Sequence, residues 1–351
     1  MTEPVRIAVV GTGLIGGIHA ERVAACPDTE LAVLCGLDRN APGLAKRLSV
    51  PLVDDFRATV DHQIDAAVVA TPNRLHSEMA IWFLEDGIPV LVEKPITDSV
   101  EAGLRLCDAA AQAGLPVLVG HHRRHHPMVQ LARKTVASEL GTFVGSSTLI
   151  SFRKPDSYYE PDWRRSDEAG PLLINLIHEV DLLRFMCDEI EAVQAVTRRL
   201  NRSWDFDDTS AIVVHFRSGA VGTIFLSDSV SAPWSWEGSV SDGIGFHNHG
   251  QDYLQAMGTK ASLSIPSLTV WRYSDRETDP GWYAPLQTRR LDIPSADPYA
   301  LQIAHFARVV RDEEPPVVTG EDGLRSLAVV AAVIEAGKSG RIVEIDSILG
   351  Q

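Results

Sequence analysis

The sequence contains no apolar run that approaches the roughly twenty residues a membrane-spanning helix needs. It also has no signal-peptide pattern, because residues 1–4 lead directly into the first predicted strand without a basic segment and an apolar core. We therefore expect a cytoplasmic protein that has no membrane partner.

Cysteine is also scarce, with four residues in 351 and no C-x-x-C spacing among them. Each cysteine lies in an apolar context, which is typical of reduced, buried thiols. We therefore expect neither disulfide bonds nor a cysteine-based zinc site at Cys26, Cys35, Cys107 and Cys187.

Positive charge is the third deficit. Lysine and arginine number 32 against 47 aspartates and glutamates, which gives a formal net charge of −15. Nucleic acids and anionic membranes bind basic patches, so we expect neither as a partner and expect a small molecule instead. A hydrophobic content of 45% and a charged content of 23% are ordinary for a globular protein, and 351 residues suit two domains.

A glycine pattern near the start of the chain gives the strongest functional signal. The pattern G-x-G-x-x-G stands between a strand predicted at 7–10 and an amphipathic helix predicted at 15–25. Such glycines permit a tight turn, close approach of backbone amides to a pyrophosphate, and packing of the helix on the strand. We therefore predict a dinucleotide site at Gly11, Thr12, Gly13, Leu14, Ile15 and Gly16.

An acidic residue after the second predicted strand, residues 31–37, supports this interpretation. Asp38 follows that strand at the offset where a carboxylate accepts hydrogen bonds from the ribose hydroxyls of NAD. Asp38 would repel a 2'-phosphate, although Arg39 could pair with one. We expect NAD as the cofactor, with NADP less favoured.

The first third of the chain alternates between strands and helices. Strands are predicted at 64–70, 90–92 and 117–120, and helices at 76–85 and 100–113. This alternation predicts a Rossmann domain, a doubly wound parallel sheet, over residues 1–122.

The pattern after residue 123 changes to short strands, predicted at 144–151, 190–198, 211–216, 220–227 and 262–265. Helices are predicted at 171–186, 299–311 and 323–336, before a last strand at 341–345. We expect residues 123–351 to form an α/β domain with a large, mainly antiparallel open sheet. Both domains thus belong to the α/β class, and the C-terminal helical segment is expected to return toward the Rossmann domain.

Polar residues follow two of the predicted parallel strands, at the edge where doubly wound sheets bind ligands. Thr71, Pro72 and Asn73 follow one strand, and Glu93 and Lys94 follow the other. An ammonium group at such an edge could hydrogen-bond a substrate oxygen and ease proton transfer. The alternative is a loop lysine that pairs with Glu93.

These segments, together with His19, His76 and residues 120–124, resemble the glucose-fructose oxidoreductase, inositol dehydrogenase and MocA (Gfo/Idh/MocA) family over nearly the whole chain. The resemblance implies a Rossmann domain, a second domain with a large open sheet, and reversible hydride transfer between nicotinamide and a sugar or polyol carbon. It also implies that Lys94 is catalytic. The cofactor site is then expected to include Thr71, Pro72, Asn73, His76, Glu93, Lys94 and His122.

The family's second catalytic element is a helix with an acid and, four residues later, a histidine. His178 fits the histidine, but Ile174 occupies the place of the acid and Asn175 is the nearest polar side chain. On a helix Asn175, His178 and Asp181 share a face, so Asn175 could orient a substrate, although it cannot act as an acid or base. We predict Lys94, His178 and Asn175 as the catalytic set. The alternative for His178 is a hydrogen-bonded core histidine.

Other side chains are expected to border the substrate. They are Lys94, His122, Arg123, Trp163, Arg164, Asn175, His178 and His247. The histidine-rich stretch 121–126 does not predict a metal site, because adjacent side chains on an extended segment point to opposite faces. The segment 234–236, Trp-Ser-Trp, could be a sugar platform or packing.

These observations predict an NAD-dependent oxidoreductase that acts on a secondary alcohol of a sugar, an inositol-like polyol or a related cyclic hydroxy compound. A redox-neutral, NAD-retaining glycosidase or epimerase and a non-catalytic nicotinamide-nucleotide sensor are the alternatives. The open sheet has one face to cover, so we expect a homodimer or homotetramer that forms through it.

Overall fold

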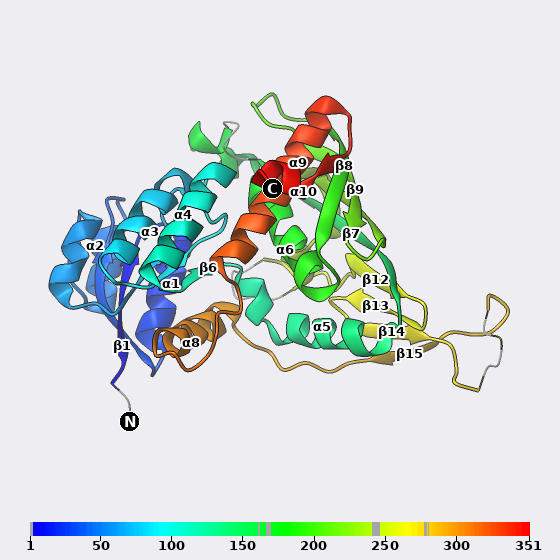
Figure 1. Ribbon diagram of the computed structural model, residues 1–351, viewed down its shortest axis with the longest axis horizontal. Helices are drawn as coiled ribbons and strands as arrows, with labels where there is room; N and C mark the ends of the chain where they lie inside the picture. The colour runs from blue at the N-terminus through cyan, green and yellow to red at the C-terminus, as the bar shows by residue number, and fades with distance from the viewer. Residues whose placement is uncertain (1–2, 161, 166–169, 241–245, 277–278, 280) are drawn as a thin grey trace. The chain divides into compact units, whose positions relative to one another are not determined.

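The computed structural model describes residues 3–160, 162–165, 170–240, 246–276, 279 and 281–351. The chain divides into two compact units (Figure 1). The first unit runs to His125 and resumes at Asp297–Leu327, and the second consists of His126–Ala296 and Ala328–Gln351. The boundary between residues 122 and 123 stays a prediction.

A six-stranded parallel sheet in the order β3-β2-β1-β4-β5-β6 forms the centre of the first unit. Its strands are near-continuous runs of valine, leucine, isoleucine and alanine, as expected when helices cover both faces of a sheet. The predicted doubly wound sheet is thereby confirmed. The strands are β1 (Val5–Val10), β2 (Thr29–Cys35), β3 (Leu52–Val53), β4 (Ala66–Val69), β5 (Val90–Val92) and β6 (Val117–Val119).

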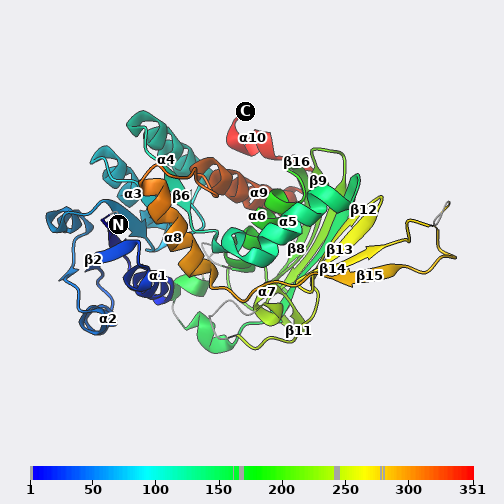
Figure 2. The same ribbon diagram turned by 90° about the horizontal axis from the view of Figure 1, so that it is seen from below.

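The helices of this unit come from both ends of the chain. Helix α8 (Pro298–Val310) packs beside α1 and buries Ile303 and Phe306 in the core of the sheet (Figure 2). An ion pair of 2.6 Å links Arg22, in the last turn of α1, to Asp297, the N-cap of α8. The other helices are α1 (Leu14–Ala25), α2 (Ala41–Leu48), η1 (Phe56–His62), η2 (Asn73–Leu75), α3 (His76–Glu85), α4 (Val100–Ala113) and η3 (His122–His125).

The second unit contains a ten-stranded sheet in the order β15-β14-β13-β12-β7-β10-β9-β8-β16, with β11 beside β7. All its pairs are antiparallel except β10 with β7, which confirms the mainly antiparallel sheet. The strands are β7 (Phe143–Arg153), β8 (Ile190–Arg198), β9 (Thr209–Phe216), β10 (Val221–Ser227), β11 (Ser229–Trp234), β12 (Leu254–Gly258), β13 (Ala261–Ile265), β14 (Thr269–Arg272), β15 (Gln287–Arg290) and β16 (Val343–Glu344).

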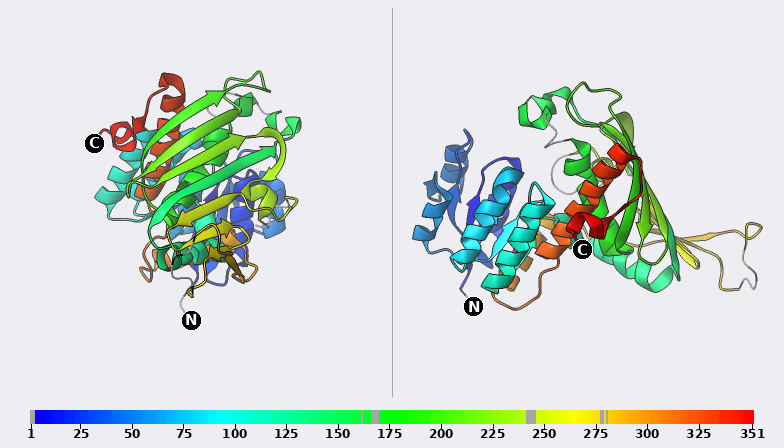
Figure 3. Two further views of the ribbon diagram at one scale, coloured as in Figure 1. Left: turned by 90° about the vertical axis from the view of Figure 1, so that its right-hand side faces the viewer. Right: turned by 45° about the horizontal axis from the view of Figure 1, so that its top comes forward.

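One face of this sheet carries the helices α5 (Pro127–Glu139), α6 (Ile177–Met186) and the end of α9 (Gly320–Ser339), and among the described residues no helix crosses the opposite face (Figure 3). Buried and exposed residues alternate along β9 and β10, as they do when one face packs on a core. By their register, the exposed apolar residues Val196, Val213, Val221, Phe225, Met257 and Trp271 lie on this uncovered face. We call these six residues the outer sheet face.

Three expectations about element type need correction. The helix predicted at 171–186 begins with a π-helical turn, η6 (Leu172–Leu176), before α6 starts. The strand predicted at 341–345 has only the two residues of β16, because α10 (Ile345–Leu349) follows it at once. Helix α5 was not predicted, although it has two start signals. Pro127 occupies its first position, and His126 Nδ1 accepts a 3.1 Å hydrogen bond from Met128 N.

No helix in the described ranges combines the length and the apolar character that crossing a membrane requires. The remaining short helical turns are η4 (Asp156–Tyr159), η5 (Asp162–Arg165) and α7 (Trp236–Ser239), all in the second unit.

Candidate functional site

The glycine loop joins β1 to α1, and its glycines meet different constraints. Gly11 has a φ of +101°, and a Cβ there would lie 2.3 Å from the Ala70 carbonyl oxygen. A Cβ at Gly16 would lie 2.0 Å from the Gly11 carbonyl oxygen, so neither position accepts a larger residue. A Cβ at Gly13 would meet no atom within 4 Å. The loop is therefore closely packed at Gly11 and Gly16 and open at Gly13.

The first turn of α1 is suited to an anion. Gly13 is the N-cap and supplies no side chain, and the turn contains no acidic residue. Backbone N–H groups in a first helical turn have no partner within the helix, and the helix dipole is positive there. Leu14 is exposed and Ile15 is half-buried. The open space at Gly13 and the free helix end fit the pyrophosphate of a dinucleotide.

The carboxylate of Asp38 is fixed beside this loop. It accepts hydrogen bonds from Thr12 Oγ1 and, at 2.8 Å, from Asn40 N. Gly36 permits this contact, because a Cβ there would lie 2.1 Å from Thr12 Oγ1. Asp38 and Arg39 are exposed, so both are open to an adenosine ribose. Sequence reasoning missed Gly36, whose signal is a glycine two residues before the acid.

A buried histidine connects the ends of β4 and β5. His76 Nε2 lies 2.8 Å from the Thr71 carbonyl oxygen, and Nδ1 lies 2.9 Å from that of Pro95. Burial lowers the pKa of His76, against the effect of the two carbonyls. The ring therefore lies between the strand ends that carry Thr71, Pro72, Asn73 and Lys94, and in its neutral form it donates to one of the two carbonyls. Contact of His76 with the cofactor stays a prediction.

Glu93 is buried directly before the half-buried Lys94. Its Oε1 lies 2.8 Å from His19 Nε2, and its Oε2 accepts a 3.0 Å hydrogen bond from Lys94 N. Burial by itself raises the pKa of Glu93, but the hydrogen bond from His19 and the charges of His19 and Lys94 outweigh burial and hold this pKa below its usual value. Lys94 therefore follows an ionised carboxylate.

The side chains of the histidine-rich stretch 121–126 have different surroundings. His122 stacks on Tyr299 with 4.0 Å between ring centroids, whereas His126 caps α5. Burial and then the charges of Arg123 and Lys94 hold the pKa of His122 well below its usual value, so this ring is neutral near pH 7. Within the described ranges, no three residues among His, Cys, Asp and Glu are grouped so that they could hold a metal ion.

In the second unit, Asn175 and His178 lie in η6 and α6 and are only 6% and 7% exposed. Asn175 Oδ1 accepts a 2.7 Å hydrogen bond from Lys154 Nζ, and its Nδ2 donates to Glu237 Oε1 at 3.3 Å. The amide thus bridges an ammonium and a carboxylate. π-helical turns occur frequently at functional sites. Lys154 and Glu237 were not predicted, since they are distant from Asn175 in sequence.

Further charges surround Lys154. Asp228 is fully buried and lies 3.7 Å from Lys154 Nζ and 3.6 Å from Arg202 Nε. The hydroxyl of Tyr159 donates to Asp228 as well. The ring of Tyr158 lies 4.9 Å from Lys154 Nζ, and burial raises the pKa of this tyrosine. Asn175 therefore belongs to a buried polar network.

The structure gives less support to the other predicted substrate contacts. Arg164 lies 4.2 Å from the Tyr158 ring and donates to the Tyr158 carbonyl oxygen, but the side chain of Trp163 lies outside the described part of the chain. His247 is exposed beside His249. Trp236 is fully buried, which favours packing over a sugar platform for that residue.

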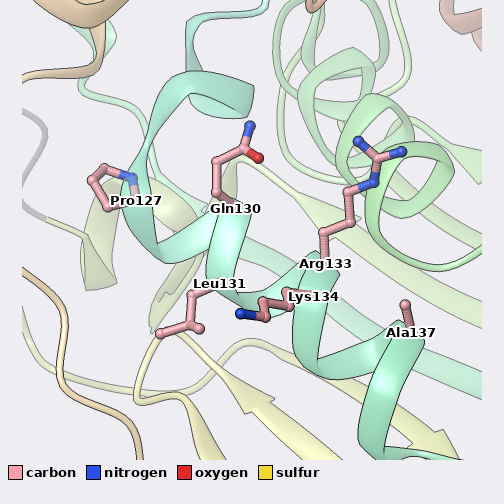
Figure 4. A pocket seen from close by; sticks show the side chains of 6 residues that line it. All are labelled: Pro127, Gln130, Leu131, Arg133, Lys134 and Ala137. Carbon is pink, nitrogen blue, oxygen red and sulfur yellow. The ribbon is translucent and has the colours of Figure 1, made fainter.

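A surface depression on α5 contains none of the predicted site residues (Figure 4). Its lining is Pro127, Gln130, Leu131, Arg133, Lys134 and Ala137, which all come from one helix. It includes no carboxylate, histidine or cysteine, and its ionisable side chains are Arg133 and Lys134.

The fold and the glycine loop define a dinucleotide-binding protein with a Rossmann unit and a second α/β unit. Residues 5–121 match the NAD-binding Rossmann fold of the Gfo/Idh/MocA oxidoreductase family, and residues 139–345 match the C-terminal alpha/beta domain of the same family. The chain belongs to this family, which confirms the resemblance found in the sequence and the expected NAD-binding domain.

Relatives align over almost the entire chain. The chain is 27% identical to scyllo-inositol 2-dehydrogenase (NAD(+)) of Bacillus subtilis, covering 99% of this chain and 98% of that protein. It is 25% identical to D-xylose 1-dehydrogenase (NADP(+)) 2 of Haloferax volcanii, covering 96% and 99%. The fold also matches the WlbA dehydrogenase of Bordetella pertussis, solved with NADH and UDP-GlcNAcA, at a TM-score of 0.77, 22% identity and coverage of 97% and 99%.

Replacing Gly13 tests the anion site at α1. We expect Gly13→Val to weaken NAD binding by about tenfold or more, because the side chain would occupy the space open to the pyrophosphate. Calorimetric titration with NAD+ measures the affinity, and thermal unfolding should change little. Gly17→Val is the control, since Gly17 also faces open space but lies beyond the helix cap. Equal losses in both variants would contradict this placement.

Removing the amide of Asn175 tests the polar network. We expect Asn175→Ala to lower the free energy of unfolding by about 1–3 kcal/mol, because it leaves the buried Lys154 and the half-buried Glu237 without their bridge. Denaturant unfolding measures this change. Asn40→Ala is the matched control, because Asn40 is exposed and makes no side-chain cap. A loss no larger than that of the control would show that the bridge is not stabilising.

Proposed function

We propose that this protein is an NAD-dependent dehydrogenase that acts on a secondary alcohol of a sugar, an inositol-like polyol or a related cyclic hydroxy compound. One observation supports it above all: the ionised Glu93 stands directly before Lys94 at the end of a strand whose sheet also carries the dinucleotide loop. Bound nicotinamide would supply the hydride-accepting carbon, and the protein would position the alcohol and exclude water.

The preference for NAD rests on Asp38. Its carboxylate is fixed by Thr12 and exposed toward solvent, where it would accept ribose hydroxyls and repel a 2'-phosphate. Arg39 is exposed next to it and could offset part of that repulsion. The relatives include an NAD(+) enzyme and an NADP(+) enzyme, so the acid is the argument for NAD.

Two residues are proposed to act on the hydroxyl group of the alcohol. His178 would take the hydroxyl proton of the alcohol, since the ordinary pKa of histidine lies close to neutrality. The ammonium of Lys94 would donate a hydrogen bond to the same oxygen and stabilise the negative charge that develops on it. Asn175 would act indirectly, because its amide already bonds Lys154 and Glu237.

The proposed class of polyhydroxylated substrates rests on hydrogen-bonding groups of the second unit. Lys154, Glu237 and the Tyr158–Arg164 pair provide donors and acceptors of the kind that polyhydroxylated compounds bind. The Bacillus subtilis relative is named for an inositol, and the Haloferax volcanii relative for a pentose. Contacts of His122, Arg123, Trp163 and His247 with the substrate, and a cytoplasmic location, stay parts of the proposal.

A second copy of the chain would cover the outer sheet face. Its six exposed apolar residues lie on strands of one sheet, with the exposed Gln194 and Thr223 between them, and an apolar patch of this kind is suited to a self-complementary interface. We therefore propose a homodimer or homotetramer through this face.

Single substitutions test the proton-transfer roles. We expect Lys94→Ala and His178→Ala each to lower kcat by about 10²–10⁴-fold, the usual contribution of a positioned proton-transfer group. NAD affinity should change little. NADH formation with a panel of sugars, inositols and cyclic hydroxy acids measures kcat, and Lys46→Ala, at an exposed site of the same unit, is the control.

Unchanged turnover in either variant would remove that residue from the mechanism. Binding of NAD without turnover of any alcohol would contradict the dehydrogenase proposal. NAD that stays bound through gel filtration would then favour a redox-neutral enzyme.

A charge on the outer sheet face tests the assembly. We expect Phe225→Glu to lower the sedimentation mass to that of a smaller assembly, because the carboxylate would be buried without a partner. Analytical ultracentrifugation measures the mass. Ile342→Glu, at another exposed apolar residue, should leave it unchanged. A wild-type protein that sediments as a monomer would overturn this part of the proposal.

A further inference from the structure

A buried histidine outside the assigned catalytic set contacts the residue before Lys94. His19 is on α1 and is 0% exposed, and its Nε2 lies 2.8 Å from Glu93 Oε1. His19 Nδ1 has no hydrogen-bond partner within the described part of the chain. The proton of a neutral His19 ring therefore belongs on Nε2, where it is donated to the carboxylate.

The position of the Glu93 carboxylate is tightly determined. Glu93 N donates a 2.8 Å hydrogen bond to Val69 O, which holds its backbone in the sheet. A Cβ at Gly120 would lie 2.6 Å from Glu93 Oε1, so the carboxylate fills space that only glycine leaves. Its other oxygen accepts from Lys94 N. The carboxylate thus connects His19 directly to the backbone of Lys94.

An aromatic residue from the returning C-terminal segment adjoins this pair. Tyr299, on α8, meets the His19 ring edge-on with 5.7 Å between centroids and stacks on His122. Tyr299 is itself only 3% exposed. The His19–Glu93 contact is therefore sealed from water, where a charge-assisted hydrogen bond is strong.

We propose that His19 is a positioning residue for Lys94, which holds the Glu93 carboxylate ionised and in place so that this carboxylate keeps the neighbouring Lys94 ammonium protonated. This inference rests on the proposed catalytic role of Lys94. It adds no bond-forming step, because no proton leaves His19, Glu93 stays ionised, and both act through charge and hydrogen bonding alone.

Glu93 supplies negative charge next to Lys94. Burial lowers the pKa of both His76 and His122, so both rings are neutral near pH 7. His19 on α1 and His76 on α3 interact with the Glu93 carboxylate, whereas His121 and Arg123 act on the His122 ring, which stacks on Tyr299 of α8.

The direction of the expected effect follows from this charge. Loss of the carboxylate charge in Glu93→Gln disfavours the ammonium form, so the pKa of Lys94 should fall by about one unit, a tenfold change in its protonation equilibrium. His19→Leu should lower the pKa of Lys94 less, because the Glu93 carboxylate remains but loses its hydrogen bond with His19. His19→Gln keeps a donor near the position of Nε2 and should restore the wild-type value.

Competitive labelling of the whole protein with acetic anhydride measures this titration directly. The sequence has only six lysines, and the exposed Lys46 serves as the internal reference. Thr29→Val is the matched control, because it removes another buried hydrogen bond of the same unit, from Thr29 Oγ1 to Val23 O at 2.7 Å. It should lower the thermal stability without changing the Lys94 titration.

The inference is overturned if Lys94 titrates as in the wild type in both Glu93→Gln and His19→Leu, whatever their stability. Should His19→Leu not fold, Glu93→Gln and His19→Gln still decide the question. The basic limb of the kcat/KM profile should move to lower pH in the same variants. Because labelling does not depend on turnover, a failed catalytic role of Lys94 is distinguished from a failed role of His19.

Discussion

The close approach of helix α1 to the turn after β1 is the constraint on which the candidate cofactor site depends. The Gly16 backbone lies so near the Gly11 carbonyl that no side chain fits at Gly16, and the Ala70 carbonyl likewise excludes a side chain at Gly11. This contact points the free N-terminus of α1 at the loop and places Thr12 against Asp38. It also sets the depth of the helix, so that one turn later His19 reaches Glu93 at the end of β5. The phosphate site and the surroundings of Lys94 are thus consequences of one backbone contact.

Both units keep charges in their interiors by surrounding them with partners. An isolated buried charge is costly, and the cost falls only when each polar atom is hydrogen-bonded or paired. Glu93 meets this requirement with His19 and the Lys94 amide, and Asp228 meets it with Tyr159 and two cations. Such networks resist movement, because displacing one member leaves another without its partner. They are therefore suited to hold reacting groups in fixed positions.

Local signals in the sequence were sufficient where structure depends on neighbouring residues. The glycine pattern, the apolar strands and the acid after the second strand predicted the Rossmann unit, because strand and turn preferences act over a few residues. The π-helical turn at 172–176 was not predicted, since its register depends on what the helix packs against. The contacts of Asn175 with Lys154 and Glu237 span 21 and 62 residues of chain, and no local pattern marks them.

The sequence by itself determined the fold class, the family and the glycine loop with its acidic partner, because each follows from residue types at short, regular spacing. Only the tertiary structure decided that Asn175 bridges two charges, that His76 connects two strand ends, and that His19 supports the residue before Lys94. The physical reason is burial. A polar side chain in the core must find a partner wherever the packing of distant segments provides one, and that choice is made in three dimensions.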